Sequence, residues 1–284
     1  MQVRNEPAFP TGEGGLVRLR LDLAYDGTNF SGWALQPGLR TVQGVLEQAL
    51  ATLFRVPRVP VVVAGRTDAG VHAAAQVVHV DVDQSRWQQE AARMVRRLAG
   101  LLPPDVRVYS VVVAHPDFDA RFAALWRRYR YRITDADAGP DPLRRLDTAG
   151  WKRRLDVDRM RAAADLLLGL NDFAAFCRRR EGASTIRELQ YLDVVRQGQL
   201  IQIDVRADAF CHSMVRSLVG ALAAVGDGSQ DEGWPATLLS RSLRSDMVVV
   251  APAKGLTLME VGYPPDTALA TRAAESRTVR SLSP

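Results

Sequence analysis

The chain has 284 residues, enough for one large domain or two ordinary ones, and its apolar fraction of 47% supports a packed core. A net charge of +5 and a pI near 9.6 favour a polyanionic partner, although the arginine richness also fits the codon bias of a GC-rich genome. No run is apolar enough to span a bilayer and the N-terminus lacks the apolar core of a signal peptide, so the sequence predicts a cytoplasmic protein without membrane contact.

The first half of the chain alternates strand-like and helix-like patterns after a flexible leader at residues 1–15. Thr41 is placed to cap a helix, and Ser85 with Gln88 forms a capping box for a second helix that Gly100 ends. Period-two alternation or short β-branched runs predict strands at residues 17–23, 61–63, 77–82 and 106–113.

The second half repeats this alternation. Asp156 or Asp158 caps a helix that Gly169 closes, residues 210–225 form another helix, and residues 135–154 form a long exposed connection. A short helix follows near residues 235–243. Strands are predicted at residues 126–133, 186–195, 200–207 and 256–261, with a hairpin turn at Gly198. The first of them places Tyr129, Tyr131 and Ile133 on one face and Arg128, Arg130 and Arg132 on the other.

Both halves therefore share an approximate strand, helix, strand, strand, helix, strand order. The sequence predicts an α+β protein made of two related α/β halves, residues 16–114 and 115–265, with mostly antiparallel sheets covered by helices. Residues 266–284 are low in apolar content and are expected to be a disordered tail.

The segment at residues 65–73, Gly-Arg-Thr-Asp-Ala-Gly-Val-His-Ala, falls between two predicted strands and is expected to be a loop at the end of a sheet. Its small residues leave the backbone nearly bare around Asp68. A carboxylate beside Arg66 and Thr67 should stay ionised and ready to act as a nucleophile or a base. The alternative is an Asx-type turn in which Asp68 only binds local amides.

No cofactor is indicated by the sequence. There is no GxGxxG after a strand and no GxxxxGK motif. The two cysteines, Cys177 and Cys211, are far apart and lack a CxxC spacing, which argues against a disulfide framework and a zinc–thiolate site. The four histidines form no HxxH or HxxxH pair, so a protein-bound metal is not expected.

Taken together, the ordered motifs resemble the A family of tRNA pseudouridine synthases. The resemblance covers about residues 17–264, and its most specific part is the nonamer around Asp68. The matching segments are residues 25–33 (Tyr-Asp-Gly-Thr-Asn-Phe-Ser-Gly-Trp), 41–44, 65–73, 120–122, 128–131, 172–173, 176–177, 209–210, 214–216 and 251–256. It implies the pseudouridine synthase fold with an active-site cleft between the halves, and isomerisation of uridines in the anticodon stem and loop at tRNA positions 38, 39 and 40.

The resemblance also implies roles for individual residues. Asp68 would be the essential group, either attacking C1′ of the ribose or removing a proton from C2′, and Arg216 would hold it by an ion pair. Tyr129 would lie against the uracil and accept or relay the C5 proton, and Arg66 would help hold a flipped nucleotide. Leu256 and Leu258 resemble the apolar wall under the base. Without the resemblance, Arg216 would be a surface arginine on a helix and Tyr129 a sheet aromatic. Arg66 would be a partner of local carbonyls, and Leu256 and Leu258 would pack a core strand.

The family further implies a homodimer that binds one tRNA across both subunits, with no metal or redox cofactor. Four positions depart from the family pattern: Ala34, Asp119, Asn171 and Asp208. Candidate phosphate contacts are the arginine groups at residues 127–132, 144–145, 152–154 and 178–180. Taken alone, each group is more typical of a solvated surface run, but together on a basic chain they favour a broad RNA footprint.

Two other classes of protein remain to be weighed. One is a catalytically silent RNA-binding or RNA-chaperone protein that kept the fold. The other is a metal-dependent hydrolase using Asp22, Asp26 and Asp68, which lack supporting ligands in the sequence.

Overall fold

A computed structural model describes residues 15–178, 184–241 and 245–278. The described chain clusters into two units, which we call unit 1 and unit 2. Unit 1 contains residues up to 69 together with 73–124 and 263–277, and unit 2 contains residues 70–72 and 125–262. The predicted boundary between residues 114 and 115 therefore lies ten residues further on. No helix in the described ranges is both long enough and apolar enough to cross a bilayer.

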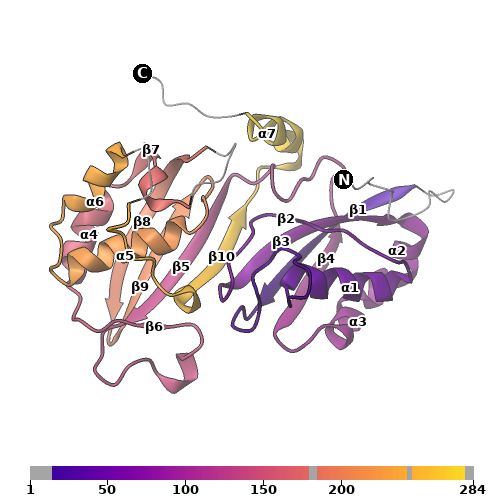
Figure 1. The fold of residues 1–284 in the computed structure, drawn as a ribbon. Helices are drawn as coiled ribbons and strands as arrows, with labels where there is room; N and C mark the ends of the chain where they lie inside the picture. The colour runs from indigo at the N-terminus through magenta and orange to yellow at the C-terminus, as the bar shows by residue number, and fades with distance from the viewer. Residues whose placement is uncertain (1–14, 179–183, 242–244, 279–284) are drawn as a thin grey trace. The chain divides into compact units, whose positions relative to one another are not determined.

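Unit 1 is built on an antiparallel sheet in the order β4, β1, β3, with β2 pairing with β3 (Figure 1). Leu19, Leu21 and Leu23 of β1 are fully buried while the residues between them are only half-buried, which confirms the predicted alternation. In β3, by contrast, Val77, Val78, His79, Val80 and Val82 are all buried, because both faces of this strand are covered. The bounds are β1 Leu16–Tyr25, β2 Val62–Val63, β3 His72–Asp83 and β4 Val106–Val113.

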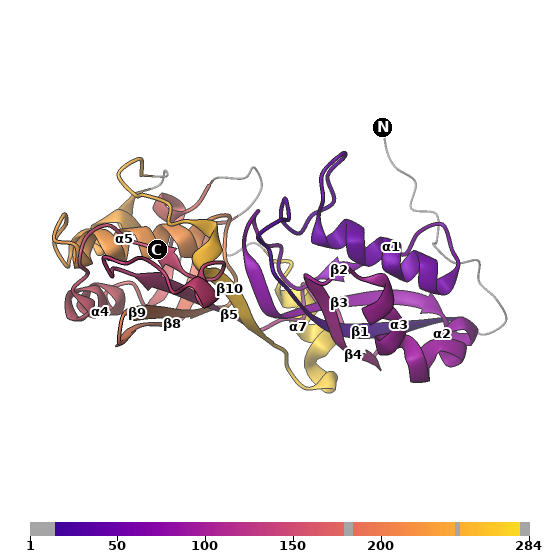
Figure 2. The same ribbon diagram turned by 90° about the horizontal axis from the view of Figure 1, so that it is seen from below.

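Three helices pack on one face of this sheet: α1 (Val42–Phe54), α2 (Gln84–Glu90) and α3 (Met94–Leu101) (Figures 1 and 2). Thr41 caps α1 as predicted, its side chain accepting from Gly44 N at 3.3 Å. The capping box proposed for the second helix is wrong. Asp83 is the cap, accepting from Arg86 N at 3.0 Å, and Ser85 donates to Asp83.

The second predicted helix is also divided. A 3₁₀ turn, η1 (Ala91–Arg93), separates α2 from α3, which runs past Gly100 and ends at Leu101. The buried residues of α3 are Met94 and Leu98. Their spacing of four residues is the helical stripe that α3 uses.

The other face of unit 1 is covered by residues 115–124 and by the C-terminal segment. Tyr263 donates from its hydroxyl to Ala120 O at 2.7 Å, and its ring lies 4.9 Å from that of Phe118. Burial and the nearby Arg18 charge lower the pKa of His79 to about 4, so this neutral ring accepts from Ala120 N at 2.9 Å. These contacts explain why residues 115–124 cluster with the N-terminal half.

The predicted disordered tail is wrong for its described part. Residues 266–275 form the 3₁₀ turn η6 (Asp266–Ala268) and the helix α7 (Leu269–Glu275). Leu269 is 1% exposed and Ala273 is 5% exposed, and Arg272 donates to Ala124 O. Leu269 and Ala273, one turn apart, are the two buried residues of this helix, and two apolar side chains leave little hydrophobic signal in the sequence. The leader at residues 1–14 and residues 279–284 lie outside the described chain.

Unit 2 is built on an antiparallel sheet in the order β10, β5, β9, β8, β7, with β6 added in parallel to β5. The hairpin of β8 and β9 turns at Gly198, where φ is +62°, as predicted. Tyr129, Tyr131 and Ile133 are buried on one face of β5, with the arginines between them on the other. The bounds are β5 Trp126–Thr134, β6 Ala149–Gly150, β7 Gly169–Asp172, β8 Ile186–Gln197, β9 Leu200–Ala207 and β10 Leu256–Gly262.

Helices α4 (Val157–Asp165) and α5 (Met214–Gly226) cover one face of this sheet (Figure 2). Asp156 is the N-cap of α4, accepting from the amides of Asp158 and Arg159. The helix α5 begins at Met214, four residues later than predicted, so His212 precedes it. A short helix, α6 (Trp234–Thr237), continues as the 3₁₀ turn η4 (Leu238–Ser240).

The connection after β5 is mostly exposed, as predicted, but it is not without secondary structure. It contains the 3₁₀ turn η2 (Pro142–Arg144) and the strand β6, and Asp135 at its start is 3% exposed. The Asp135 carboxylate accepts two bonds from Arg196, at 2.9 and 2.8 Å, and one from Leu155 N at 2.8 Å. The bonds from Arg196 are the main reason that the pKa of Asp135 falls to about 2.

We expect Asp135→Asn to lower the free energy of unfolding by about 2 kcal/mol near neutral pH, because it removes the charge that Arg196 binds. The depressed pKa makes this contribution fully present above the unfolded-state pKa of about 4. The stabilisation by the ionised Asp135 carboxylate should decrease as the pH falls towards about 2. Urea unfolding at several pH values measures it. The exposed Asp137→Asn is the control, and a pH-independent difference for Asp135→Asn would contradict the assignment.

Candidate active site

Asp68 lies in the loop between β2 and β3, where its side chain is half-buried while Arg66 and Ala69 are exposed. The backbone of Gly70 has a φ of +76°, the left-handed region that favours glycine. A Cβ on Gly70 would lie 3.2 Å from the Cβ of Ala253. The predicted loop is confirmed, except that β3 already begins at the histidine of the nonamer.

The loop backbone is held immediately before Asp68. Gly65 O accepts from Gln76 Nε2 at 2.8 Å, and Thr67 O accepts from Trp33 N at 3.0 Å. Gly32 has a φ of +93°, and a Cβ there would lie 3.0 Å from Thr67 O. The bare backbone of Gly32 is therefore what lets residues 32–33 approach the loop closely.

Behind these backbone contacts lies a buried polar group. The Tyr25 hydroxyl is 2.8 Å from Thr67 Oγ1 and accepts from Gln76 Nε2 at 3.1 Å. Tyr25 is 4% exposed, Thr67 7% and Gln76 0%. Burial raises the pKa of Tyr25 to about 12, so the phenol stays protonated at physiological pH. Sequence reasoning assigned no role to Gln76, whose only signal was an amide in an otherwise apolar strand.

The end of the nonamer is fixed by His72, which is 6% exposed. Its Nε2 lies 2.9 Å from Leu146 O and 3.1 Å from Lys254 O. Both carbonyls belong to unit 2, as does His72 itself. The nonamer thus contributes Asp68 to one unit and His72 to the other.

Tyr129 is 7% exposed on the helix-covered face of β5. The ring of Phe210 meets it edge-on, with centroids 5.1 Å apart and planes at 89°. Leu258 of β10 is paired directly opposite Tyr129 and is fully buried. The tyrosine therefore sits between an aromatic edge and an aliphatic side chain.

Tyr131 is held differently. It is fully buried, its hydroxyl donates to Pro252 O at 2.8 Å, and burial raises its pKa above the usual value. Leu256, 5% exposed, is paired opposite it. A Cβ on Gly255 would clash with the Tyr131 ring. Tyr131 is thus a core anchor for residues 252–256.

Arg216 lies on α5, and its Nε donates to Ala251 O at 2.7 Å. Ala251 N in turn donates to Arg216 O at 3.1 Å. One turn further on, a Cβ at Gly220 would clash with the carbonyl of Val249. The glycine therefore allows residues 249–251 to approach α5 closely, and Arg216 donates to this segment. Tyr129, Arg216, Leu256 and Leu258 all belong to unit 2, whereas Arg66 and Asp68 belong to unit 1.

The interpretation of the two cysteines is wrong: the structure joins Cys177 and Cys211 in a disulfide, with Cα atoms 5.7 Å apart. Cys177 follows the 3₁₀ turn η3 (Ala174–Phe176), and Cys211 precedes α5. Arg178 N donates to His212 O at 3.0 Å and holds the two segments together. Sequence spacing reports metal motifs such as CxxC, but it does not report which distant segments the fold brings together.

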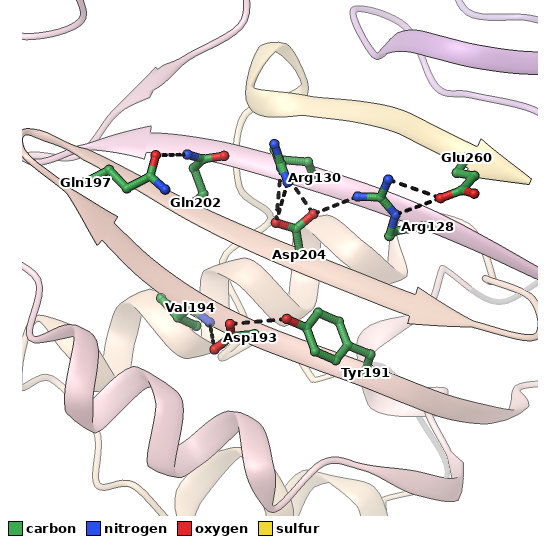
Figure 3. Close-up of polar contacts among 9 residues, drawn as sticks. All are labelled: Arg128, Arg130, Tyr191, Asp193, Val194, Gln197, Gln202, Asp204 and Glu260. Atoms are coloured by element: carbon green, nitrogen blue, oxygen red, sulfur yellow. Dashed lines mark hydrogen bonds and ion pairs between the residues drawn. The ribbon is translucent and has the colours of Figure 1, made fainter.

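The predicted arginine groups are mostly engaged by acids of the same chain. On the outer face of the unit 2 sheet, Arg128 and Arg130 both bind Asp204, and Arg128 also binds Glu260 (Figure 3). Elsewhere, Arg132 and Arg144 pair with Asp147, Arg153 with Asp227 and Arg154 with Asp135. Of residues 178–180, only Arg178 lies within the described chain.

Three of the departures from the family pattern have local structural roles. Asp119 accepts from the amides of Arg121 and Phe122 at 2.8 and 2.9 Å. Asp208 accepts from those of Glu188 and Ala209 at 3.0 and 2.8 Å. Asn171 donates to Leu168 O at 3.2 Å. Each ties down a turn.

The fold and the loop define an α+β protein that displays a carboxylate beside a cationic loop residue. The family model described as tRNA pseudouridine synthase matches residues 23–123 and 163–264. The chain is 58% identical over 267 residues to the tRNA pseudouridine synthase A of Frankia casuarinae, covering 94% of this chain and 96% of that one. It is 52% identical to the proteins of the same name from Streptomyces griseus (95% and 96% covered) and Mycobacterium leprae (93% and 96% covered). The chain belongs to the tRNA pseudouridine synthase family.

We expect the double substitution Cys177→Ser, Cys211→Ser to lower the free energy of unfolding of the oxidised protein. The disulfide closes a loop with a sequence separation of 34 residues. Loss of that constraint on the unfolded chain should cost about 3–4 kcal/mol. Denaturant unfolding measures it. Reduction of the unsubstituted protein should produce the same shift, and reduction of the double variant should produce none.

The pairing has an independent readout. Thiol titration of the denatured, non-reduced protein should find no free thiols, and the same titration after reduction should find two. Two thiols before reduction would contradict the disulfide.

Proposed function

We propose that this chain converts uridine to pseudouridine in the anticodon stem and loop of tRNA, at positions 38, 39 and 40. The C1′–N1 bond breaks, the uracil turns, and a C1′–C5 bond forms with loss of the C5 proton. The family supports the reaction. The observation that carries the assignment of its centre is the half-buried Asp68 on a loop whose backbone is bonded immediately before it.

Asp68 is the essential group in this proposal, either as the nucleophile at C1′ or as the base at C2′. Both routes need an ionised carboxylate with a fixed direction. Arg216 is assigned to hold that charge by an ion pair, a role that its bond to Ala251 supports because the bond fixes one edge of the guanidinium.

The remaining site residues contact the uracil base and its nucleotide. Tyr129 lies against the uracil and accepts or relays the C5 proton, and its contact with Phe210 supports a fixed ring orientation. Leu256 and Leu258 form the apolar wall under the base. Arg66, which is exposed, holds the nucleotide once it has been flipped out of the stem, a step that costs a few kcal/mol of unstacking.

The proposal also includes a homodimer in the cytoplasm that binds the anticodon arm of one tRNA across both subunits.

The two alternative functions differ from this proposal in what they require. A silent RNA-binding protein would bind tRNA without turnover. A metal-dependent hydrolase using Asp22 and Asp26 is disfavoured, because Asp22 pairs with Arg20 and Asp26 accepts two bonds from Thr28.

We expect the protein to release tritium from tRNA carrying [5-³H]uridine, because formation of the C1′–C5 bond must expel the C5 hydrogen. Asp68→Asn keeps the shape of the side chain but removes its charge, and it should lower the rate by at least about 1,000-fold. The exposed Asp165→Asn is the matched control and should retain the parent rate. Binding of tRNA without release by the parent protein would instead identify the silent binding protein.

We expect tRNA binding to weaken steeply with salt, because the chain carries a net charge of +5 and phosphate contacts release counterions. Between about 50 and 200 mM salt, the dissociation constant should rise by at least about tenfold. Filter binding or fluorescence anisotropy measures this. Arg128→Ala should leave the slope nearly unchanged, because that charge is already compensated by Asp204 and Glu260. A flat salt response of the parent would exclude a broad phosphate footprint.

A further inference from the structure

Three buried polar side chains in unit 1 form one hydrogen-bonded chain that ends beside Asp68. Gln76 Nε2 donates to the Tyr25 hydroxyl and to Gly65 O, and the Tyr25 hydroxyl lies 2.8 Å from Thr67 Oγ1. All three side chains are at most 7% exposed. Apolar residues could fill this volume without the cost of desolvating polar groups, so a polar chain at this place calls for a specific reason.

The donor and acceptor groups of these side chains fit one connected set of hydrogen bonds. The Tyr25 hydroxyl accepts from Gln76 Nε2, and its pKa of about 12 keeps it protonated, so it has a hydrogen of its own for the bond with Thr67 Oγ1, in which either oxygen can donate. The Gln76 amide orientation follows from Oε1 accepting from Val77 N at 3.2 Å. The hydrogen bonds therefore connect Gln76 to Thr67 through the Tyr25 hydroxyl.

Thr67 is thereby fixed at two points. Its hydroxyl is held by Tyr25, and its carbonyl accepts from Trp33 N at 3.0 Å. That carbonyl belongs to the peptide group that leads into Asp68. Hydrogen bonds are directional, whereas apolar packing constrains orientation only weakly, so this pair of bonds sets the plane from which the carboxylate projects.

We propose that Tyr25 and Gln76 are positioning residues for the isomerisation, acting through Thr67 to hold the direction of the Asp68 carboxylate. The inference rests on the proposed function, in which Asp68 is the reacting group. A nucleophile or base must be held within a fraction of an ångström of its productive position, and a loop achieves this only with support from groups behind it.

The test is the single-turnover rate of tritium release, measured beside the dissociation constant for tRNA. Tyr25→Phe removes one oxygen from the buried chain. It should slow release by about 10- to 100-fold while the dissociation constant changes by less than about twofold. Tyr109→Phe is the matched control in the same unit, because Tyr109 is 65% exposed on β4, and it should retain the parent rate.

Substitutions of Thr67 test the same chain with Tyr25 intact. Thr67→Ser keeps the hydroxyl and should retain a rate close to that of the parent, whereas Thr67→Val should slow release as much as Tyr25→Phe does. Because Tyr25 acts through Thr67, the double variant Tyr25→Phe, Thr67→Val should release tritium at a rate within about twofold of that of the slower single variant. A merely structural role would give independent losses that multiply.

The outcomes separate this inference from the function on which it rests. Absence of release by the parent overturns the proposed function. Release by the parent but not by Asp68→Asn, together with an unchanged rate in Tyr25→Phe and Thr67→Val, overturns only the positioning role. The positioning role is also overturned if the losses of rate multiply in the double variant, or if the affinity for tRNA falls by the same factor as the rate.

Discussion

In the proposed function the Asp68 carboxylate must be open to its substrate and still point in one direction, and the loop around it meets both demands through its backbone. Small residues on either side leave the backbone bare, while Gly65 O and Thr67 O accept from the buried Gln76 and Trp33. The groups that restrain the loop therefore lie in the core of unit 1, on the side away from solvent. A loop, ordinarily the least ordered part of a domain, is in this way held without covering its exposed residues.

Most elements of the fold could be predicted because their signals are local. The alternation in β1, the Thr41 cap of α1 and the glycine turn of the β8–β9 hairpin each depend on residues within a few positions of one another. In β5, alternation even separated the buried tyrosines from the half-buried arginines. The family motifs then added the chemistry, which neither spacing nor composition contains.

Several of the wrong predictions share a different cause, because they depend on segments far apart in the sequence. The helix α7 belongs to unit 1, although the other segments of that unit end at residue 124, and its Arg272 donates to Ala124 O. Cys177 and Cys211 meet because two loops are joined beside the start of α5. In the sequence, Gln76 is a polar residue in an otherwise apolar strand. Its role is evident only from its hydrogen bond to Tyr25, at the end of β1.

The same distinction applies to charge. A run of arginines on one strand suggests a phosphate-binding surface when only the sequence is read. In the sheet, Asp204 lies on the neighbouring strand directly opposite Arg130 and binds both Arg128 and Arg130, so much of that positive charge is compensated within the protein. Asp119 and Asp208 likewise add negative charge, but Asp119 accepts backbone amides in its own turn, and Asp208 accepts the amides of Ala209 and of Glu188 on β8. The positive charge left for binding RNA therefore depends on which arginines have no acidic side chain opposite them on the neighbouring strand. That pairing depends on the strand register, which is a property of the folded sheet.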